Sequence, residues 1–187
     1  TFTWSVQSAT NVTGATAGSG NLIAQTLTST DGVNSGTVTY LILPAAAGCV
    51  GTPYAVNVTV KPIPNVAASP QSICSGANTS VAITNPNGVA GTSFSWIVFS
   101  SSNVSGAAAG SGTTISQALT STDGITSGTV TYRITPTANG CSGNFLDVVV
   151  PVNPAPVVTN TSPSLIQEIC SATALNFLPT SSIGGTT

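Results

Sequence analysis

The chain has 187 residues, of which only 3% are charged: 2 Lys and Arg, 4 Asp and Glu, and no His. Two cations cannot neutralise a run of phosphates, so the composition excludes nucleic-acid binding by counterion release. Without histidine, and with only four scattered acids, it lacks the usual general base and the ligand set of a metal site. We therefore expect no enzyme, no cofactor and no metal.

The apolar runs are too short to cross a membrane as a helix. The longest candidates, at 41–47 and 148–150, are broken by proline, whereas a spanning helix needs about 18 apolar residues or more. No N-terminal targeting segment is visible, and we expect this segment not to enter a membrane.

The first 64 residues recur 92 positions further along the chain, with 37 identities and no gap. Beyond them the offset grows by four, so that Cys74 falls on Cys170. A period this long and this well kept indicates tandem copies of one module. Proline clusters at 61–64 and 153–156 predict the linkers.

These linkers predict three segments. Residues 1–64 are an incomplete repeat without its N-terminal strands, residues 65–156 are a complete repeat, and residues 157–187 are the N-terminal strands of a third. We interpret the chain as part of a longer array. The alternative is a subunit whose tail completes the head of the next subunit.

The complete repeat is predicted to consist of β-strands throughout, because apolar residues alternate with small polar ones at period two. The inward residues in chain order are Val81, Ile83, Phe94, Trp96, Val98, Ile115, Leu119, Val130, Tyr132, Ile134, Val148, Val150 and Val152. Turn signals separate the runs, at residues 85–88, 110–112, 123–124 and 139–140. This spacing is typical of an antiparallel sandwich.

Four aromatic residues are predicted to be structural core. Trp4 and Trp96 lie in the strand where an immunoglobulin-like sandwich buries its core indole. Tyr40 and Tyr132 lie late in their modules, as the tyrosine of its tyrosine corner does. All four are in phase with the apolar face, so core packing explains them better than ligand stacking. Each sandwich, of some 90 residues, is expected to fold by itself and to be joined end to end with the next.

The cysteines predict a disulfide. Each repeat has one cysteine near its start and one after its tyrosine strand, which favours a Cys74–Cys141 bond, with Cys49 and Cys170 paired outside this chain. The rival pairing is Cys49–Cys74 with Cys141–Cys170, across the linkers. Either pairing implies an oxidising compartment outside the cytoplasm.

The repeated acids Asp31 and Asp123 are interpreted as turn residues, because each begins an Asp-Gly turn. The remaining charged residues, Lys61, Arg133, Asp147 and Glu168, are not repeated and are expected to be solvated.

Several motifs together resemble the PKD-like, immunoglobulin-like repeats of giant cell-surface adhesins from Bacteroidota. They lie at residues 71–76, 91–96, 128–136, 139–143 and 150–154. The chain lacks the Trp-x-Phe-Gly-Asp-Gly sequence of typical PKD domains. The resemblance implies secretion, commonly through the type IX system, and attachment at the outer membrane as a stalk or filament, including the adhesins of gliding motility.

The leading hypothesis is therefore a non-enzymatic stalk whose partners are neighbouring repeats, surface glycans or other cells. A second is a carbohydrate-binding accessory module, which requires Tyr54, Phe99 and Phe145 to be exposed. A third is a self-assembling fibre, in which residues 157–187 of one subunit complete residues 1–64 of the next and Cys170 bonds Cys49 of that neighbour.

Overall fold

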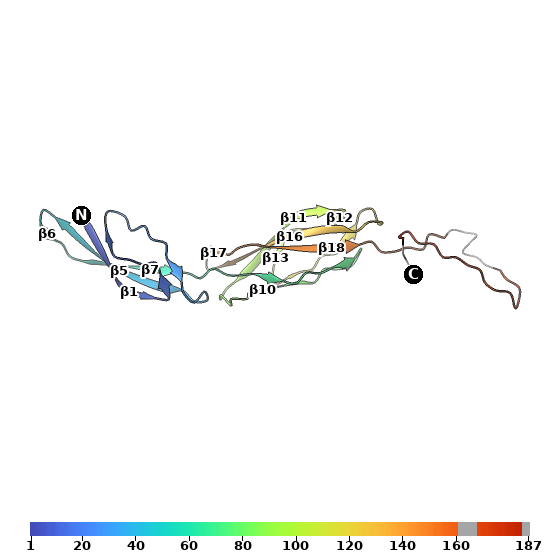
Figure 1. Cartoon of the computed structure of the whole chain (residues 1–187), viewed down its shortest axis with the longest axis horizontal. Helices are drawn as coiled ribbons and strands as arrows, with labels where there is room; N and C mark the ends of the chain where they lie inside the picture. The colour runs from blue at the N-terminus through green and yellow to red at the C-terminus, as the bar shows by residue number, and fades with distance from the viewer. Residues whose placement is uncertain (161–167, 185–187) are drawn as a thin grey trace. The chain divides into compact units, whose positions relative to one another are not determined.

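The structure is a computed structural model that describes residues 1–160 and 168–184 (Figure 1). The described residues contain strands and turns but no helix, so the predicted all-β class is confirmed. The chain divides into two compact units. Unit 1 comprises Thr1–Ala67, Thr84–Phe94 and Thr135–Phe145, and unit 2 comprises the described residues of Ala68–Ile83, Ser95–Ile134 and Leu146–Thr187.

The first repeat is built on one antiparallel sheet with the order β3-β1-β5-β6, in which β7 also pairs with β5. A second, two-stranded sheet pairs β2 with β4. The strands are β1 (Phe2–Thr10), β2 (Val12–Thr13), β3 (Gly18–Ser19), β4 (Thr28–Ser29), β5 (Gly36–Ala46), β6 (Cys49–Val50) and β7 (Tyr54–Val60).

The core of this repeat is small. Trp4, Val12, Val38 and Tyr40 are buried, and a rim of half-buried side chains packs against them: Val6, Ala15, Ile23, Leu27, Ile42, Val58 and Val60. The alternation in β5, with Val38 and Tyr40 inward and threonines between them, follows from the pleat of a strand.

The second repeat has two main sheets. One has the order β14-β10-β8; the other runs β13-β11-β16-β18-β9, with β17 on β16, and β12 pairs with β15. The strands are β8 (Ala67–Ala68), β9 (Ile73–Cys74), β10 (Val81–Thr84), β11 (Ser93–Ser102), β12 (Val104–Ser105), β13 (Gly110–Ser111), β14 (Thr114–Ile115), β15 (Thr120–Ser121), β16 (Gly128–Ala138), β17 (Cys141–Ser142) and β18 (Leu146–Asn153).

Buried side chains come from both main sheets of this repeat. Val81, Ile83 and Ile115 come from the smaller sheet, and the larger one supplies Trp96, Tyr132, Ile134, Val148, Val150 and Val152. The pairing of β9 with β18 is parallel, with Ile73 opposite Val152 and Cys74 opposite Asn153. Two sheets that both supply buried side chains fit an immunoglobulin-like β-sandwich.

Candidate functional site

Each repeat places its tryptophan against a glycine of the neighbouring strand. Trp96 is 6% exposed and lies opposite Gly110 in the β11–β13 pair. A Cβ atom added to Gly110 would lie 2.7 Å from Cζ2 of Trp96, and one added to Gly18 would lie 2.7 Å from Cζ2 of Trp4. The indoles therefore occupy space that only glycine leaves free.

The two buried tyrosines have a partner that the sequence patterns did not reveal. The hydroxyl of Tyr132 donates to Oε1 of Gln117 at 2.7 Å. The amide of Gln117 also accepts from the backbone N–H of Ala108 and donates to its carbonyl. Burial raises the pKa of the Tyr132 hydroxyl.

The first repeat has the same arrangement. Tyr40 donates to Gln25 at 2.6 Å, and Gln25 makes both backbone hydrogen bonds to Thr16. In the first repeat the glutamine therefore links β5 to the loop that follows β2. In the second repeat it links β16 to the loop that follows β12. Its recurrence at the offset of 92 was the signal that could have identified it.

Asp31 and Asp123 organise the turns in which they lie. Oδ1 of Asp123 accepts from the backbone N–H groups of Ile125 and Thr126 at 2.9 Å. The hydroxyl of Thr126, followed by these N–H groups, holds the pKa of Asp123 well below its usual range. Asp31 accepts from the backbone N–H groups that follow it, which lower its pKa as well. Both carboxylates are thus engaged by their own loops.

The predicted Cys74–Cys141 disulfide is wrong. No two of the four cysteines are bonded to each other, and the pairing of Cys49 and Cys170 outside this chain stays a prediction. Cys74 follows Ile73, which pairs with Val152 at the Gly128 end of β16, whereas Cys141 pairs with Ala138 at the other end. At about 3.3 Å per residue the ends of β16 lie roughly 30 Å apart, far beyond the reach of a disulfide.

Tyr54, Phe99 and Phe145 are all exposed, at 71%, 53% and 56%. Tyr54 alternates in phase with the half-buried valines of β7. Phe99 is on β11, and the guanidinium of Arg133 lies 3.6 Å from the centre of its ring. Arg133 in turn makes a bidentate ion pair with Asp147 at 2.8 and 2.7 Å. One face of Phe99 is therefore already covered by a cation held in place.

Within unit 1, the linker is hydrogen-bonded to a turn of the second repeat. The side-chain amide of Asn87 donates to the carbonyls of Gly32 and Ile63, at 3.1 and 2.9 Å. Its Oδ1 accepts from the backbone N–H of Asn65 at 3.0 Å. One side chain thus satisfies three backbone groups of the first repeat and the linker.

The turn at residues 139–140 of the second repeat also contacts the linker. Nζ of Lys61 donates to the carbonyl of Asn139 at 2.7 Å. The carbonyl oxygen of Pro64 lies so close to Gly143 that a Cβ added there would come within 1.9 Å of it. The expectation that Lys61 is merely solvated is therefore incomplete, since its ammonium has a specific acceptor.

Acidic and thiol side chains do not gather anywhere in residues 1–160 and 168–184 into a group of three that could hold a metal ion. The same residues contain no helix long and apolar enough to cross a membrane.

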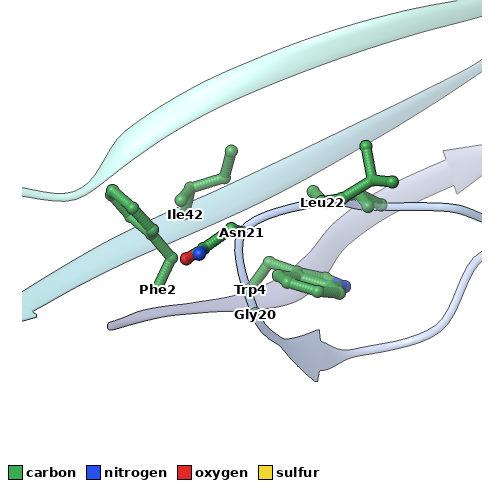
Figure 2. A pocket seen from close by; sticks show the side chains of 7 residues that line it. Phe2, Trp4, Gly20, Asn21, Leu22 and Ile42 are labelled. Atoms are coloured by element: carbon green, nitrogen blue, oxygen red, sulfur yellow. The ribbon is translucent and has the colours of Figure 1, made fainter.

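The pocket in Figure 2 is an apolar hollow of about 230 Å³ in the first repeat. Phe2 and Trp4 of β1, Ile42 of β5 and the segment at 20–23 line it. A further hollow of about 320 Å³ is lined by Ile23, Gln25, Leu27, Tyr40, Val56 and Val58. Ile23, which packs against the core cluster of this repeat, borders both hollows.

Comparison with known proteins identifies the family. The family model described as "PKD-like domain" matches residues 1–64 and 71–156. No curated protein sequence matches the chain. Among solved structures, the crystal structure of human CDH23 EC21-23 aligns over 97% of this chain and 73% of that chain, with 12% identity and a TM-score of 0.35. The chain therefore belongs to the family of PKD-like domains, with two members in tandem.

Proposed function

We propose that this chain is part of the non-enzymatic stalk of a large bacterial cell-surface adhesin, where it provides reach and mechanical rigidity for adhesion or gliding. Its partners are then neighbouring repeats of the same protein, and its place is the outer surface of the cell. The membership of a PKD-like family, in tandem copies, supports a structural or adhesive role. Secretion by the type IX system of a Bacteroidota host belongs to the same proposal.

The observation that carries the proposal is the hydrogen bonding of the linker by Asn87. A stalk needs joints that resist bending, and proline already fixes φ at Pro62 and Pro64. Asn87 then holds the linker at Ile63 and Asn65. Compact unit 1 accordingly extends past the linker into Thr84–Phe94 and Thr135–Phe145. These contacts favour a stiff connection over a free tether.

Labelling of intact cells tests the location and role. Antibodies raised against residues 1–187 should label unbroken cells, and protease treatment of those cells should remove the label. An in-frame deletion of the repeats should reduce attachment to a surface while leaving secretion of the remaining protein intact. Labelling that appears only after cell lysis would contradict the proposal.

A glycan-binding module is the second candidate, because Tyr54, Phe99 and Phe145 are exposed as that hypothesis requires. Flat rings in water can pack against the apolar faces of sugars. Titration of the chain with a panel of surface polysaccharides, read by calorimetry, tests it. Binding that Phe99→Ala or Tyr54→Ala reduces would favour this candidate, and no heat with any glycan would remove it.

A further inference from the structure

The sequence asparagine-glycine occurs twice in the chain, at residues 87–88 and 139–140. Asparagine deamidates most readily before glycine, because glycine has no Cβ to hinder attack by its own backbone nitrogen on the asparagine side chain. Both pairs lie in turns that contact the linker, Asn87 through its side chain and Asn139 through its carbonyl. A chemical change at either asparagine therefore alters the joint within unit 1.

The side chain of Asn87 is held in one position. It is half-buried and makes three hydrogen bonds to backbone groups of the first repeat and the linker, at 2.9, 3.0 and 3.1 Å. The nitrogen that would attack it is held as well, since the N–H of Gly88 donates to the carbonyl of Asn85 at 3.2 Å. Cyclisation has to break these bonds first, so the joint protects Asn87 from deamidation.

The side chain of Asn139 is held much less firmly. Both Asn139 and Gly140 are exposed. The side-chain amide of Asn139 donates to the carbonyl of Ala90 at 3.3 Å, which is longer than each of the three bonds of Asn87. The turn does not require this amide, because its counterpart in the first repeat is Ala47, whose φ of 50° matches the 53° of Asn139. Reaction at Asn139 therefore has little structure to break.

Deamidation at Asn139 creates a carboxylate beside a cation. Nζ of Lys61 donates to the backbone carbonyl of Asn139 at 2.7 Å. A carboxylate on that same residue comes within reach of the ammonium by rotation of two exposed side chains. The chain has two basic residues, and the other, Arg133, is already paired with Asp147. Lys61 is thus the cation placed to receive the new charge.

We propose that Asn139 is a site of spontaneous deamidation whose new carboxylate pairs with Lys61 of the linker, while Asn87 stays intact. The backbone nitrogen of Gly140 attacks Cγ of Asn139 and forms a C–N bond. The bond from Cγ to the amide nitrogen breaks, and that nitrogen leaves as ammonia with the proton given up by Gly140. Water then opens the succinimide ring to aspartate or isoaspartate. Water is the co-reactant, and nothing is oxidised or reduced.

The product strengthens the contact between the linker and the turn. The ammonium of Lys61, which contacts a neutral carbonyl in the unmodified chain, gains a charged partner. The formal net charge of the chain falls by one from −2. The joint is then held by an ion pair in addition to the three hydrogen bonds of Asn87. This modification goes beyond the stalk proposal and does not depend on it, because it follows from the contacts of the linker alone.

Incubation of the full chain in mildly alkaline buffer tests the selectivity, with peptide mapping by mass spectrometry at intervals. The mass gain of an amide-to-acid change should appear at Asn139, and at least roughly tenfold more slowly at Asn87. Asn139→Ala copies the counterpart Ala47 and should remove the fast change from the mass of the intact chain. Equal rates at the two asparagines, or a faster reaction at Asn87, would overturn the proposal.

The same incubation in guanidinium chloride tests whether the fold protects Asn87. Unfolding removes the hydrogen bonds of its side chain, and each asparagine is followed by glycine, so the two rates should agree within about twofold. A difference between Asn87 and Asn139 that persists in the unfolded chain would overturn the assignment of protection to the joint.

Zero-length coupling with a carbodiimide tests the ion pair, because this reagent joins a carboxylate to an amine that is in contact with it. The incubated chain and the Asn139→Asp variant should each give an amide bond between residue 139 and Lys61. The fresh chain should not give this product, and Lys61→Gln should abolish it in the Asn139→Asp background. Absence of the product from the Asn139→Asp chain would overturn the pairing with Lys61.

Discussion

Trp96 and Gly110 face each other across the β11–β13 pair so closely that no Cβ fits between them. The same relationship joins Trp4 and Gly18. The largest core side chain of each repeat is therefore matched to a position where the neighbouring strand has no side chain. A period-two pattern identifies the tryptophan as inward but does not reveal what it packs against.

Gly110→Ala should destabilise the second repeat by about 1–3 kcal/mol, the usual cost of overpacking a core. The added methyl group would meet the buried indole ring of Trp96 at 2.7 Å. Thermal unfolding measures the effect, with Ser111→Ala as the control at the exposed neighbouring position. Equal melting temperatures for the two variants would show that the ring has room to move.

Gln117→Ala should cost about 1–3 kcal/mol, because it leaves the hydroxyl of the buried Tyr132 without its acceptor. Tyr132→Phe removes both the donor and the need for an acceptor and should cost less. Urea unfolding of the two variants and of the double variant gives the coupling between the side chains. Strictly additive losses would contradict a direct role of Gln117 in satisfying Tyr132.

Acid should weaken the turns organised by Asp31 and Asp123. Their pKa values are lowered in the folded chain by hydrogen bonds from their own loops. The stabilisation is therefore fully present above the unfolded pKa of about 3.9 and is lost as pH falls toward the folded value. Melting temperatures measured from pH 7 down to pH 2 should be flat at first and then decline below about pH 4.

Asp123→Asn supplies the control for that titration. It should lower the melting temperature of the second repeat at pH 7 and flatten its decline in acid, and Asp31→Asn should do the same for the first repeat. Acid curves that keep the slope of the unmodified chain would show that these carboxylates are not the groups responsible.

Asn87→Ala should free the linker without unfolding either repeat. The backbone N–H of Asn65 loses its acceptor, and the carbonyl of Ile63 loses its donor. Amide hydrogen exchange by NMR should become faster at Asn65 than in the unmodified chain. Protection at Val38, inside the core of the first repeat, should stay the same. Unchanged exchange at Asn65 would mean that Asn87 does not hold the joint.

Local patterns predicted the strands well and the long-range pairings poorly. The alternation around Tyr132 correctly indicated an inward face, because a pleated strand alternates its side chains. Asn139 and Gly140 were expected to form a turn, and both have positive φ, at 53° and 81°. These features depend on neighbours in sequence.

The positions of the cysteines and the contacts of the glutamine and asparagine side chains depend instead on how the strands are paired. Counting one cysteine at each end of a repeat suggested a bond between Cys74 and Cys141, but the parallel pairing of β9 with β18 puts them at opposite ends of the sheet. Gln117 reaches Tyr132 across 15 positions of chain, and Asn87 reaches Gly32 across 55. No periodicity within a strand encodes such contacts.

Stretching single molecules by their two ends is the most direct test of the proposal that these repeats resist mechanical tension. The second repeat, residues 65–156, should resist force and then yield in one step. That step would release about 90 residues, or at most roughly 300 Å of chain. Smooth extension at low force, without a discrete step of that length, would contradict a mechanical role.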